Sequence, residues 1–282
     1  MLLDITWTAD PVIFSIGPKE IRWYTLMFLI GFAVGYKIVE RMFRREGLNE
    51  KWLDPLLYFT LAGTLIGARL GHCIFYNPSY YFSHPVEILK VWEGGLASHG
   101  GVLGIIIAIY FFSRYVSHRS MLWTFDKLVV PTGLVAALIR IGNLMNHEIY
   151  GHPTDLPWGF RFVKNLYAWR HGAAPIFTPP SHPTQLYEAL AYLVTFGVCM
   201  YLYWQRDAAR RYSGLIVGWF FVLVFGFRFL VEGIKNVQER WEYDLIAQWG
   251  VNMGQLLSIP FILAGLALIV YAYRHPIADQ AK

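Results

Sequence analysis

Long apolar stretches separated by short polar connections dominate the pattern of this chain. Seven of these stretches are long enough to cross a hydrocarbon core of about 30 Å as helices. They are expected at about 22–39, 54–75, 97–115, 125–144, 185–204, 214–232 and 255–273. The pattern predicts an all-α polytopic membrane protein with about seven transmembrane helices. We expect residues 1–282 to form a single integral-membrane domain with one long external loop at about 145–184.

The basic residues predict the orientation of these helices. One set of short connections, together with the C-terminal tail, holds 11 of the 24 Lys and Arg residues, whereas the longer opposite set holds eight. The first set is Arg41, Arg44, Arg45, Lys51, Arg114, Arg119, Arg206, Arg210, Arg211, Arg274 and Lys282, and the second is Lys19, Arg22, Lys90, Arg161, Lys164, Arg170, Lys235 and Arg240. By the positive-inside rule the first set is cytoplasmic. The N-terminus is then outside and the C-terminus inside, which requires an odd number of spans.

The composition supports the membrane assignment. Hydrophobic residues make up 56% of the chain and charged residues only 15%, too few for the surface of a soluble domain of this length. The net charge of +5 follows mostly from the cytoplasmic bias, so it does not indicate a nucleic-acid partner. Cys73 and Cys199 lie in separate apolar stretches, and a disulfide framework is not indicated.

Three arginines lie inside the apolar stretches: Arg69, Arg140 and Arg228. A charge at such a position costs roughly 2.5–3.5 kcal/mol on insertion scales, so it usually faces a partner or a water-filled cavity and has a function. The planar guanidinium binds phosphate or carboxylate groups with two parallel hydrogen bonds. In a membrane the commonest ligand of that kind is a phospholipid head group. The arginines therefore favour a site for an anionic lipid.

A histidine between two glycine pairs opens the third stretch, in the sequence GGLASHGG. His99 has a side chain that titrates near neutral pH and can act as a general base. Glycines beside it allow a helix or a ligand to approach the backbone closely. The alternative is a helix-start histidine that forms a hydrogen bond at the membrane interface.

A polar cluster closes the fourth stretch. Arg140 and Asn143 are three residues apart and share a face if the helix continues. Asn146 and Glu148 follow at the helix exit, and Gly151 begins a turn rich in proline. This spacing favours a polar site at membrane depth, although a structural Arg–Glu pair that closes the helix is the alternative.

Other polar residues gather near the same side. Arg228 and Glu232 are four residues apart at the end of the sixth stretch and can pair on one helix face, for a functional or a purely structural reason. Tyr24 belongs to an expected outer aromatic belt at the start of the first stretch. A further group at the start of the fifth stretch fits an interfacial anchor turn and consists of His182, Gln185, Tyr187 and Glu188.

The sequence lacks the common motifs that bind a metal, supply a nucleophile or bind a nucleotide. It has no H-x-x-x-H or H-x-x-E-H pair for a metal, no G-x-S-x-G nucleophile elbow and no P-loop. The missing histidine pairs argue against a metal site. A nucleophile, if the chain is an enzyme, has to come from a substrate.

The chain resembles the bacterial prolipoprotein diacylglyceryl transferases. The segments that carry the resemblance are, in order, GARLGH, GGLASHGGVLG, RIGNLMNHEIYGHPTDLPWGF, HPTQLYEAL, FRFLVE and NMGQLLSIP, and they extend over most of residues 22–260. Two positions depart from the pattern. Ile139 stands where glycine often precedes the arginine, and the run VFGF before Arg228 lacks an expected tyrosine.

The resemblance implies an enzyme of the bacterial inner membrane with its active site on the outer side. Such an enzyme transfers the diacylglyceryl group of phosphatidylglycerol to the lipobox cysteine thiol of a preprolipoprotein, forms a thioether and releases glycerol phosphate. This is the first step of bacterial lipoprotein maturation. Besides membrane lipids, the expected partners are these two substrates. The resemblance implies no cofactor, no metal and no nucleic acid, and we expect the chain to act as a monomer.

The motif positions imply roles for individual residues. His99, Arg140 and Arg228 are expected to be catalytic, with His99 acting on the thiol and the two arginines stabilising the phosphate leaving group. The residues expected to bind substrate are Arg140, Asn143, Tyr24, Glu148, Gly151 and Glu232. The arginines could also lower the pKa of the thiol without a base.

Two other classes of function use the same residues differently. A transporter or flippase for an anionic lipid would bind its cargo at the arginines and move helices at the glycines, but the sequence has no two-half repeat of the kind common in transporters. A non-catalytic membrane assembly factor would leave the clusters around His99 and Arg140 without a purpose.

Overall fold

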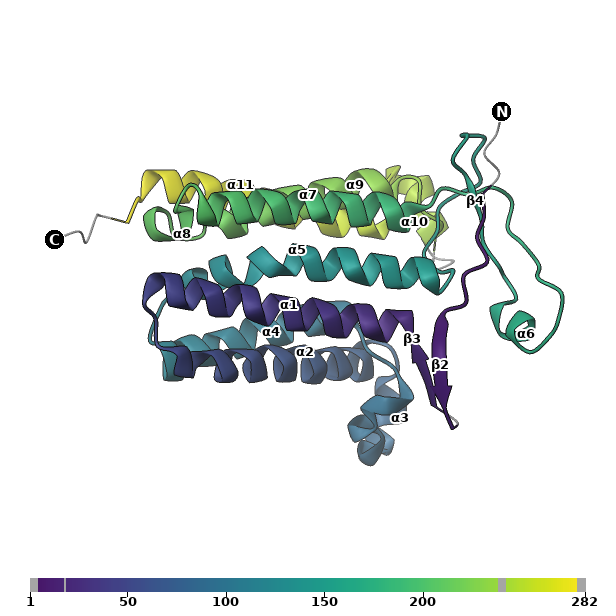
Figure 1. Cartoon of the computed structure of the whole chain (residues 1–282), viewed down its shortest axis with the longest axis horizontal. Coiled ribbons are helices and arrows are strands. Elements are labelled where there is room, and N and C mark those ends of the chain that lie inside the picture. Colours follow the sequence, from purple (N-terminus) through teal and green to yellow (C-terminus); the bar gives the residue numbers. More distant parts are fainter. Residues whose placement is uncertain (1–4, 18, 238–241, 278–282) are drawn as a thin grey trace. The chain divides into compact units, whose positions relative to one another are not determined.

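Seven long helices account for most of the structure. The computed structural model describes residues 5–17, 19–237 and 242–277 (Figure 1), so Arg240 and Lys282 lie outside the described residues. Over these ranges the helices of 15 residues or more are α1 (Trp23–Glu46), α2 (Leu53–Phe75), α4 (Ser98–Phe112), α5 (Met121–Met145), α7 (Thr184–Trp204), α9 (Leu215–Glu232) and α11 (Met253–Arg274). The seven predicted stretches coincide with them, and the largest difference is at the end of α1.

Five of the described helices are long and apolar enough to cross a membrane. They are α5, α7, α9, α11 and the segment His99–Ser117, in which a π-helical turn at Ser113–Ser117 continues α4. Their mean hydropathy ranges from 1.4 to 2.2. The chain is therefore a helical, polytopic membrane protein, as the apolar pattern predicts.

The chain forms two compact units, and each is described by itself. One contains residues 1–35 and 128–282, and the other contains residues 36–127. The boundaries fall inside α1 and α5 rather than in linkers. The single domain expected from the sequence stays a prediction.

Glycines bring α2 and α4 together in the unit of residues 36–127. A Cβ on Gly67 would lie 2.7 Å from Gly104 Cα, and one on Gly71 would lie 2.7 Å from Gly100 Cα. The two helix backbones can approach this closely only because neither side carries a side chain. The short elements of this unit are α3 (Pro78–Ser83) and the 3₁₀ turns Glu50–Trp52, Pro85–Leu89 and Val91–Glu93.

Helix packing in the other unit also depends on small residues. Gly218 of α9 lies against Gly265 of α11, where a Cβ on Gly218 would come 2.9 Å from Gly265 O. Gly133 of α5 lies against the backbone of Phe196 of α7, and this contact packs the two helices together. Figure 1 shows α7, α9 and α11 running side by side. The short helices of this unit are α6 (Leu166–Arg170), α8 (Ala208–Arg211) and α10 (Glu242–Trp249).

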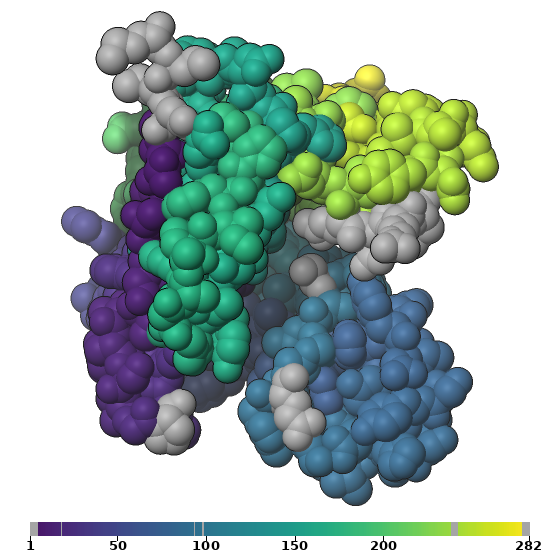
Figure 2. Space-filling model, turned by 90° about the vertical axis from the view of Figure 1, so that its right-hand side faces the viewer, coloured from purple at the N-terminus to yellow at the C-terminus, as the bar shows by residue number. Residues whose placement is uncertain are grey.

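The N-terminal segment and the long connection between α5 and α7 pack together. β1 (Ile5–Thr6) pairs in parallel with β4 (Phe160–Arg161), and β2 (Val12–Ile16) forms a hairpin with β3 (Lys19–Arg22). Arg170 binds Asp10 at 3.1 Å and Glu20 at 2.7 Å. Figure 2 shows the connection, in teal, against the N-terminal residues, in purple. The predicted loop at 145–184 therefore has a defined structure, and it packs against described residues of the N-terminal segment between Ile5 and Glu20.

Candidate active site

Arg140 lies near the end of α5 and is almost surrounded by polar partners. Its Nε is 3.0 Å from Glu188 Oε2, and its Nη1 donates a hydrogen bond of 3.1 Å to Asn143 Oδ1. The shared face of Arg140 and Asn143, predicted from their spacing, is confirmed. The Glu188 side chain is only 1% exposed, so this pair is shielded from water. The Glu188 carboxylate cannot turn to solvent, and removing its partner would leave a buried charge without compensation.

A tight turn after α5 brings Glu148 to the same cluster. Asn143 Nδ2 donates a hydrogen bond of 2.8 Å to Glu148 Oε1. From α7, Gln185 Nε2 donates to the backbone oxygen of Glu148, and Thr184 Oγ1 donates to that of Ile149. Ile149 has a φ of +61°, a conformation that costs a β-branched residue about 1–3 kcal/mol. The hydrogen bonds from α7 hold this strained turn and with it the carboxylate of Glu148.

Tyr24 at the start of α1 packs on α5 at Gly142. A Cβ on Gly142 would lie 2.8 Å from Tyr24 Cδ2 and 3.0 Å from its Cα, so only glycine allows this approach. The phenol lies within electrostatic reach of Arg140 and Glu148. The structure therefore places Tyr24 against the end of α5, near Arg140 and Glu148, and its expected role in binding substrate stays a prediction.

Arg228, near the end of α9, forms the predicted pair with Glu232. The distance from Arg228 Nε to Glu232 Oε1 is 3.3 Å, and among the described residues Glu232 is the only acid within ion-pair distance of Arg228. The Arg228 side chain is 37% exposed, the most of any charged side chain in this cluster for which an ion pair is formed. Asn252 at the start of α11 donates a hydrogen bond of 2.7 Å to the backbone oxygen of Glu232. Arg228 can therefore reach a ligand while Glu232 stays fixed.

Lys235 links the two arginine–glutamate pairs. Its Nζ lies 3.1 Å from Glu188 Oε1 and 3.1 Å from Glu232 Oε1. The cluster is thus an alternating series of charges in the order Arg140, Glu188, Lys235, Glu232 and Arg228. Sequence reasoning missed two members of the series, Glu188 and Lys235. It assigned Glu188 to an interfacial anchor turn and counted Lys235 only as an outer basic residue.

A tyrosine near the arginines comes from α7. The Tyr192 hydroxyl forms a hydrogen bond with Arg140 and lies within electrostatic reach of Arg228. The run VFGF before Arg228 serves a different purpose, because Phe225 stacks on Phe261 of α11 with ring centres 4.2 Å apart.

Gly151 has a positional role. A Cβ there would lie 2.8 Å from Thr184 Cγ2 and 2.9 Å from His182 Cβ. Its N–H donates to His182 O at 2.9 Å, and its carbonyl accepts from Asn236 Nδ2 at 2.9 Å. Both backbone groups are engaged within the protein. Gly151 therefore allows three segments to meet at the cluster, and its expected direct contact with substrate stays a prediction.

His99 lies in the unit of residues 36–127, at the start of α4, and its side chain is exposed. Its ring packs edge-on against Phe75, with centroids 5.5 Å apart, and stacks on Tyr76 at 6.0 Å. These aromatic contacts orient the ring at an exposed site. The arrangement is compatible with a base that acts on an incoming thiol.

Arg69, the third arginine in an apolar stretch, is bound to the backbone. Its guanidinium donates to the carbonyl oxygens of Ile88, Gly94, Gly95 and Glu87, and its side chain is buried. These carbonyls belong to the irregular connection between α2 and α4. Arg69 therefore stabilises this connection, and the structure does not support a lipid phosphate as its ligand.

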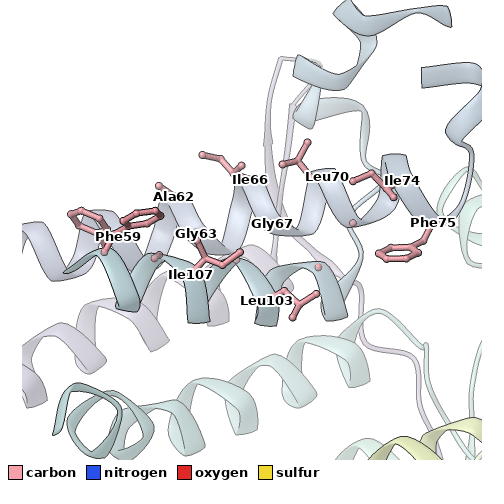
Figure 3. Close-up of a pocket in the computed structure, with 15 residues that line it drawn as sticks. Phe59, Ala62, Gly63, Ile66, Gly67, Leu70, Ile74, Phe75, Leu103 and Ile107 are labelled. Atoms are coloured by element: carbon pink, nitrogen blue, oxygen red, sulfur yellow. The ribbon is translucent and has the colours of Figure 1, made fainter. Parts of the chain in front are cut away.

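A groove between α2 and α4 is lined almost wholly by hydrocarbon (Figure 3). Its volume is about 480 Å³, and glycines form its floor. Leu70, Ile74, Phe75 and Leu103 line the groove near the end where His99 contacts Phe75. The residues that line the groove include no charged side chain.

The cluster is suited to bind an anion. Arg140 and Arg228 present guanidinium groups, and Asn143 and Tyr24 add neutral polar groups that can form hydrogen bonds. Glu188 and Glu232 each pair with two cations, and these ion pairs fix the positions of the charged side chains. Such fixed donors stabilise negative charge that develops on a ligand during a reaction.

Comparison with known proteins identifies the family. Residues 11–271 match the model of the family described as prolipoprotein diacylglyceryl transferase. A phosphatidylglycerol–prolipoprotein diacylglyceryl transferase of Porphyromonas gingivalis is 54% identical over 277 residues, which cover 98% of this chain and 97% of the relative. Relatives with the same name from Chloroherpeton thalassium and Tolumonas auensis are 44% and 41% identical, over 94% of this chain and 93% and 96% of their own lengths. The chain therefore belongs to the prolipoprotein diacylglyceryl transferase family.

Proposed function

We propose that the cluster around Arg140 and Arg228 binds the phosphate of phosphatidylglycerol and stabilises it as a leaving group. The reaction of the family is transfer of a diacylglyceryl group to prolipoprotein. The observation that carries the proposal is the pair of arginines held by buried acids within one connected series of charges. Arginine is the side chain best suited to phosphate, because its planar fork makes two parallel hydrogen bonds.

The proposed reaction is a substitution at carbon. The sulfur of the lipobox cysteine attacks the diacylglyceryl carbon that is bonded to the phosphate oxygen. A C–S bond forms, the C–O bond breaks, and its electron pair leaves with the glycerol phosphate. The thiolate is the attacking form, because a thiol is a weak nucleophile. The two guanidiniums balance the negative charge that the phosphate gains.

The other residues of the cluster have supporting roles in this proposal. Asn143 and Tyr24 form hydrogen bonds with the head group, and Glu148 and Glu232 set the geometry of Asn143 and Arg228. Gly151 keeps the turn after α5 close to α7. His99 takes the thiol proton or orients the thiol. Alternatively, the field of the arginines alone lowers the pKa of the thiol.

The proposal includes a topology. All seven long helices cross the bacterial inner membrane, the N-terminus is outside and the C-terminus is cytoplasmic. The distribution of Lys and Arg among the connections supports this orientation. The active site then faces the outer side, where preprolipoproteins arrive, and one chain is sufficient for activity.

Purified protein in phosphatidylglycerol liposomes with a lipobox peptide tests the proposal. Intact-mass analysis is expected to show a gain of one diacylglyceryl group on the Cys peptide and none on a matched Ser peptide. Movement of lipid between leaflets without a mass gain would instead support a transporter. If the assay shows no mass gain and no movement of lipid, a non-catalytic role remains.

A further inference from the structure

Lys235 occupies a position that the proposed reaction does not yet explain. Its side chain is 5% exposed, and its ammonium lies between two carboxylates that are 1% and 12% exposed. Both N–O distances are 3.1 Å, so the two carboxylate oxygens are at most the sum of these distances, 6.2 Å, apart. Two carboxylates so close repel each other strongly where water is scarce. The ammonium is what allows them to remain side by side.

The backbone around Lys235 is fixed as well. Residue 235 forms an antiparallel bridge with Gly151, and His152 N donates to Ile234 O at 2.9 Å. Asn236 Nδ2 donates to Gly151 O at 2.9 Å. The backbone of residues 234–236 is therefore fixed to the turn that follows α5.

Each carboxylate has a second task. Glu188 binds Arg140 through its other oxygen, Oε2, whereas Glu232 uses the same Oε1 for Lys235 and Arg228. The positions of the two guanidiniums thus depend on the two acids, and the positions of the acids depend on one ammonium.

We infer that Lys235 is a positioning residue for the transfer reaction: it holds Glu188 and Glu232 so that Arg140 and Arg228 act together on one phosphate. The inference rests on the proposed function. Lys235 acts through the two glutamates and needs no contact with the lipid. Its loss should therefore lower the rate of the chemical step in correctly folded protein.

Lys235→Met and Lys235→Arg test the inference. Rates of peptide lipidation at increasing phosphatidylglycerol content give kcat and KM, and both are expressed per folded molecule. Lys235→Met removes the charge and is expected to lower kcat roughly tenfold to a hundredfold, as small misplacements of catalytic groups do. Lys235→Arg keeps a cation that can bind two carboxylates and should recover at least about a third of kcat. Lys164→Met, at an exposed site in the outer connection, is the matched control.

Double variants separate positioning from an independent effect. If Lys235 acts through the glutamates, Lys235→Met should cost less than about threefold in a Glu232→Gln background, because coupled residues are not additive. If Lys235→Met alone does not fold, the inference is tested by comparing Glu232→Gln with the double variant Glu232→Gln/Lys235→Met. The double variant removes one buried charge of each sign.

Three results would overturn the inference. The first is a folded Lys235→Met with a kcat within about twofold of the wild type, and the second is a folded Lys235→Arg as slow as Lys235→Met. The third is a double variant whose loss in kcat equals the product of the losses in the two single variants. In each case a wild-type enzyme that lipidates the peptide shows that the proposed function itself still holds. A wild-type enzyme without any product would instead refute that function.

Discussion

Arg140 and Glu188 form a buried ion pair between α5 and α7, with Nε and Oε2 3.0 Å apart. Glu188 has a second cation at its other oxygen, Lys235 at 3.1 Å. One acid therefore balances two cations at a place with almost no access to water. The stability of the protein and the geometry of its arginines both depend on this carboxylate.

Glu188→Gln should destabilise the protein. The substitution leaves Arg140 and Lys235 without a shared acid, and breaking a buried pair typically costs about 3–5 kcal/mol. Thermal unfolding in detergent should show a clear drop in Tm. Glu50→Gln is the control, because Glu50 pairs with Arg44 at an exposed site. Equal melting temperatures for Glu188→Gln and the wild type would show that the pair does not stabilise the fold.

Gly142→Ala should displace Tyr24. The new Cβ would lie 2.8 Å from Tyr24 Cδ2 and 3.0 Å from its Cα, which requires the start of α1 to move. We expect kcat/KM for phosphatidylglycerol to fall about tenfold or more, by analogy with other small displacements of binding groups. Gly197→Ala in α7, where a Cβ meets nothing within 4 Å, should leave the rate unchanged. Equal rates for the two variants would remove Tyr24 from the site.

His99→Gln should slow the chemical step. If His99 is the base, its loss should lower kcat by roughly a hundredfold or more. His84→Gln is a control, because His84 lies in the same unit at an exposed site. A near-normal rate for His99→Gln would indicate that the thiol is activated by another route, with the arginine field as the first candidate.

His147 should make the stability of the protein depend on pH. Its Nδ1 accepts a hydrogen bond from Val163 N at 3.1 Å, so its Nε2 carries the proton and donates to Ala9 O at 2.9 Å. Burial is the main reason that the pKa of His147 is lowered from its usual value. The unfolded chain therefore takes up a proton at this residue below about pH 6.5, where the folded protein still resists it. The stability from neutral His147 is complete above that pH and is lost as the pH falls toward the lower folded pKa.

Melting temperatures of the wild type and His147→Gln at pH 7.5 and 5.5 measure this effect. The wild type should lose more stability at the lower pH than the variant does. His171→Gln, at an exposed site of the same connection, should behave like the wild type. An identical loss in the wild type and His147→Gln would mean that other groups cause the pH dependence.

The helices and the local pairs were predictable from the sequence. Apolar stretches predicted the seven long helices, and five of the described helices are long and apolar enough to cross a membrane, as a spanning helix has to be. The pairs Arg140–Asn143 and Arg228–Glu232 follow from helical spacing of three and four residues. Neither prediction requires knowledge of how the helices pack.

The bridge through Lys235 was not predictable in the same way. Glu188 and Lys235 are 47 residues apart, and they meet only because the turn at Gly151 pairs with residue 235. Arg69 is the reverse case, because the sequence predicted a ligand that the structure does not support. Its charge in an apolar stretch indicated a ligand, but the irregular backbone between α2 and α4 supplies carbonyl oxygens that satisfy it. Hydropathy does not show where unpaired backbone groups lie.

The central claim is that Arg140 and Arg228 together stabilise glycerol phosphate as it leaves. The most direct measurement follows lipidated peptide and released glycerol phosphate in parallel, at saturating phosphatidylglycerol, for the wild type, Arg140→Ala and Arg228→Ala. The account predicts one glycerol phosphate for each thioether in the wild type and a loss of about a hundredfold in kcat for each folded variant, equivalent to about 3 kcal/mol. Normal turnover in either folded variant, or a lipidated peptide that retains the phosphate, would contradict it.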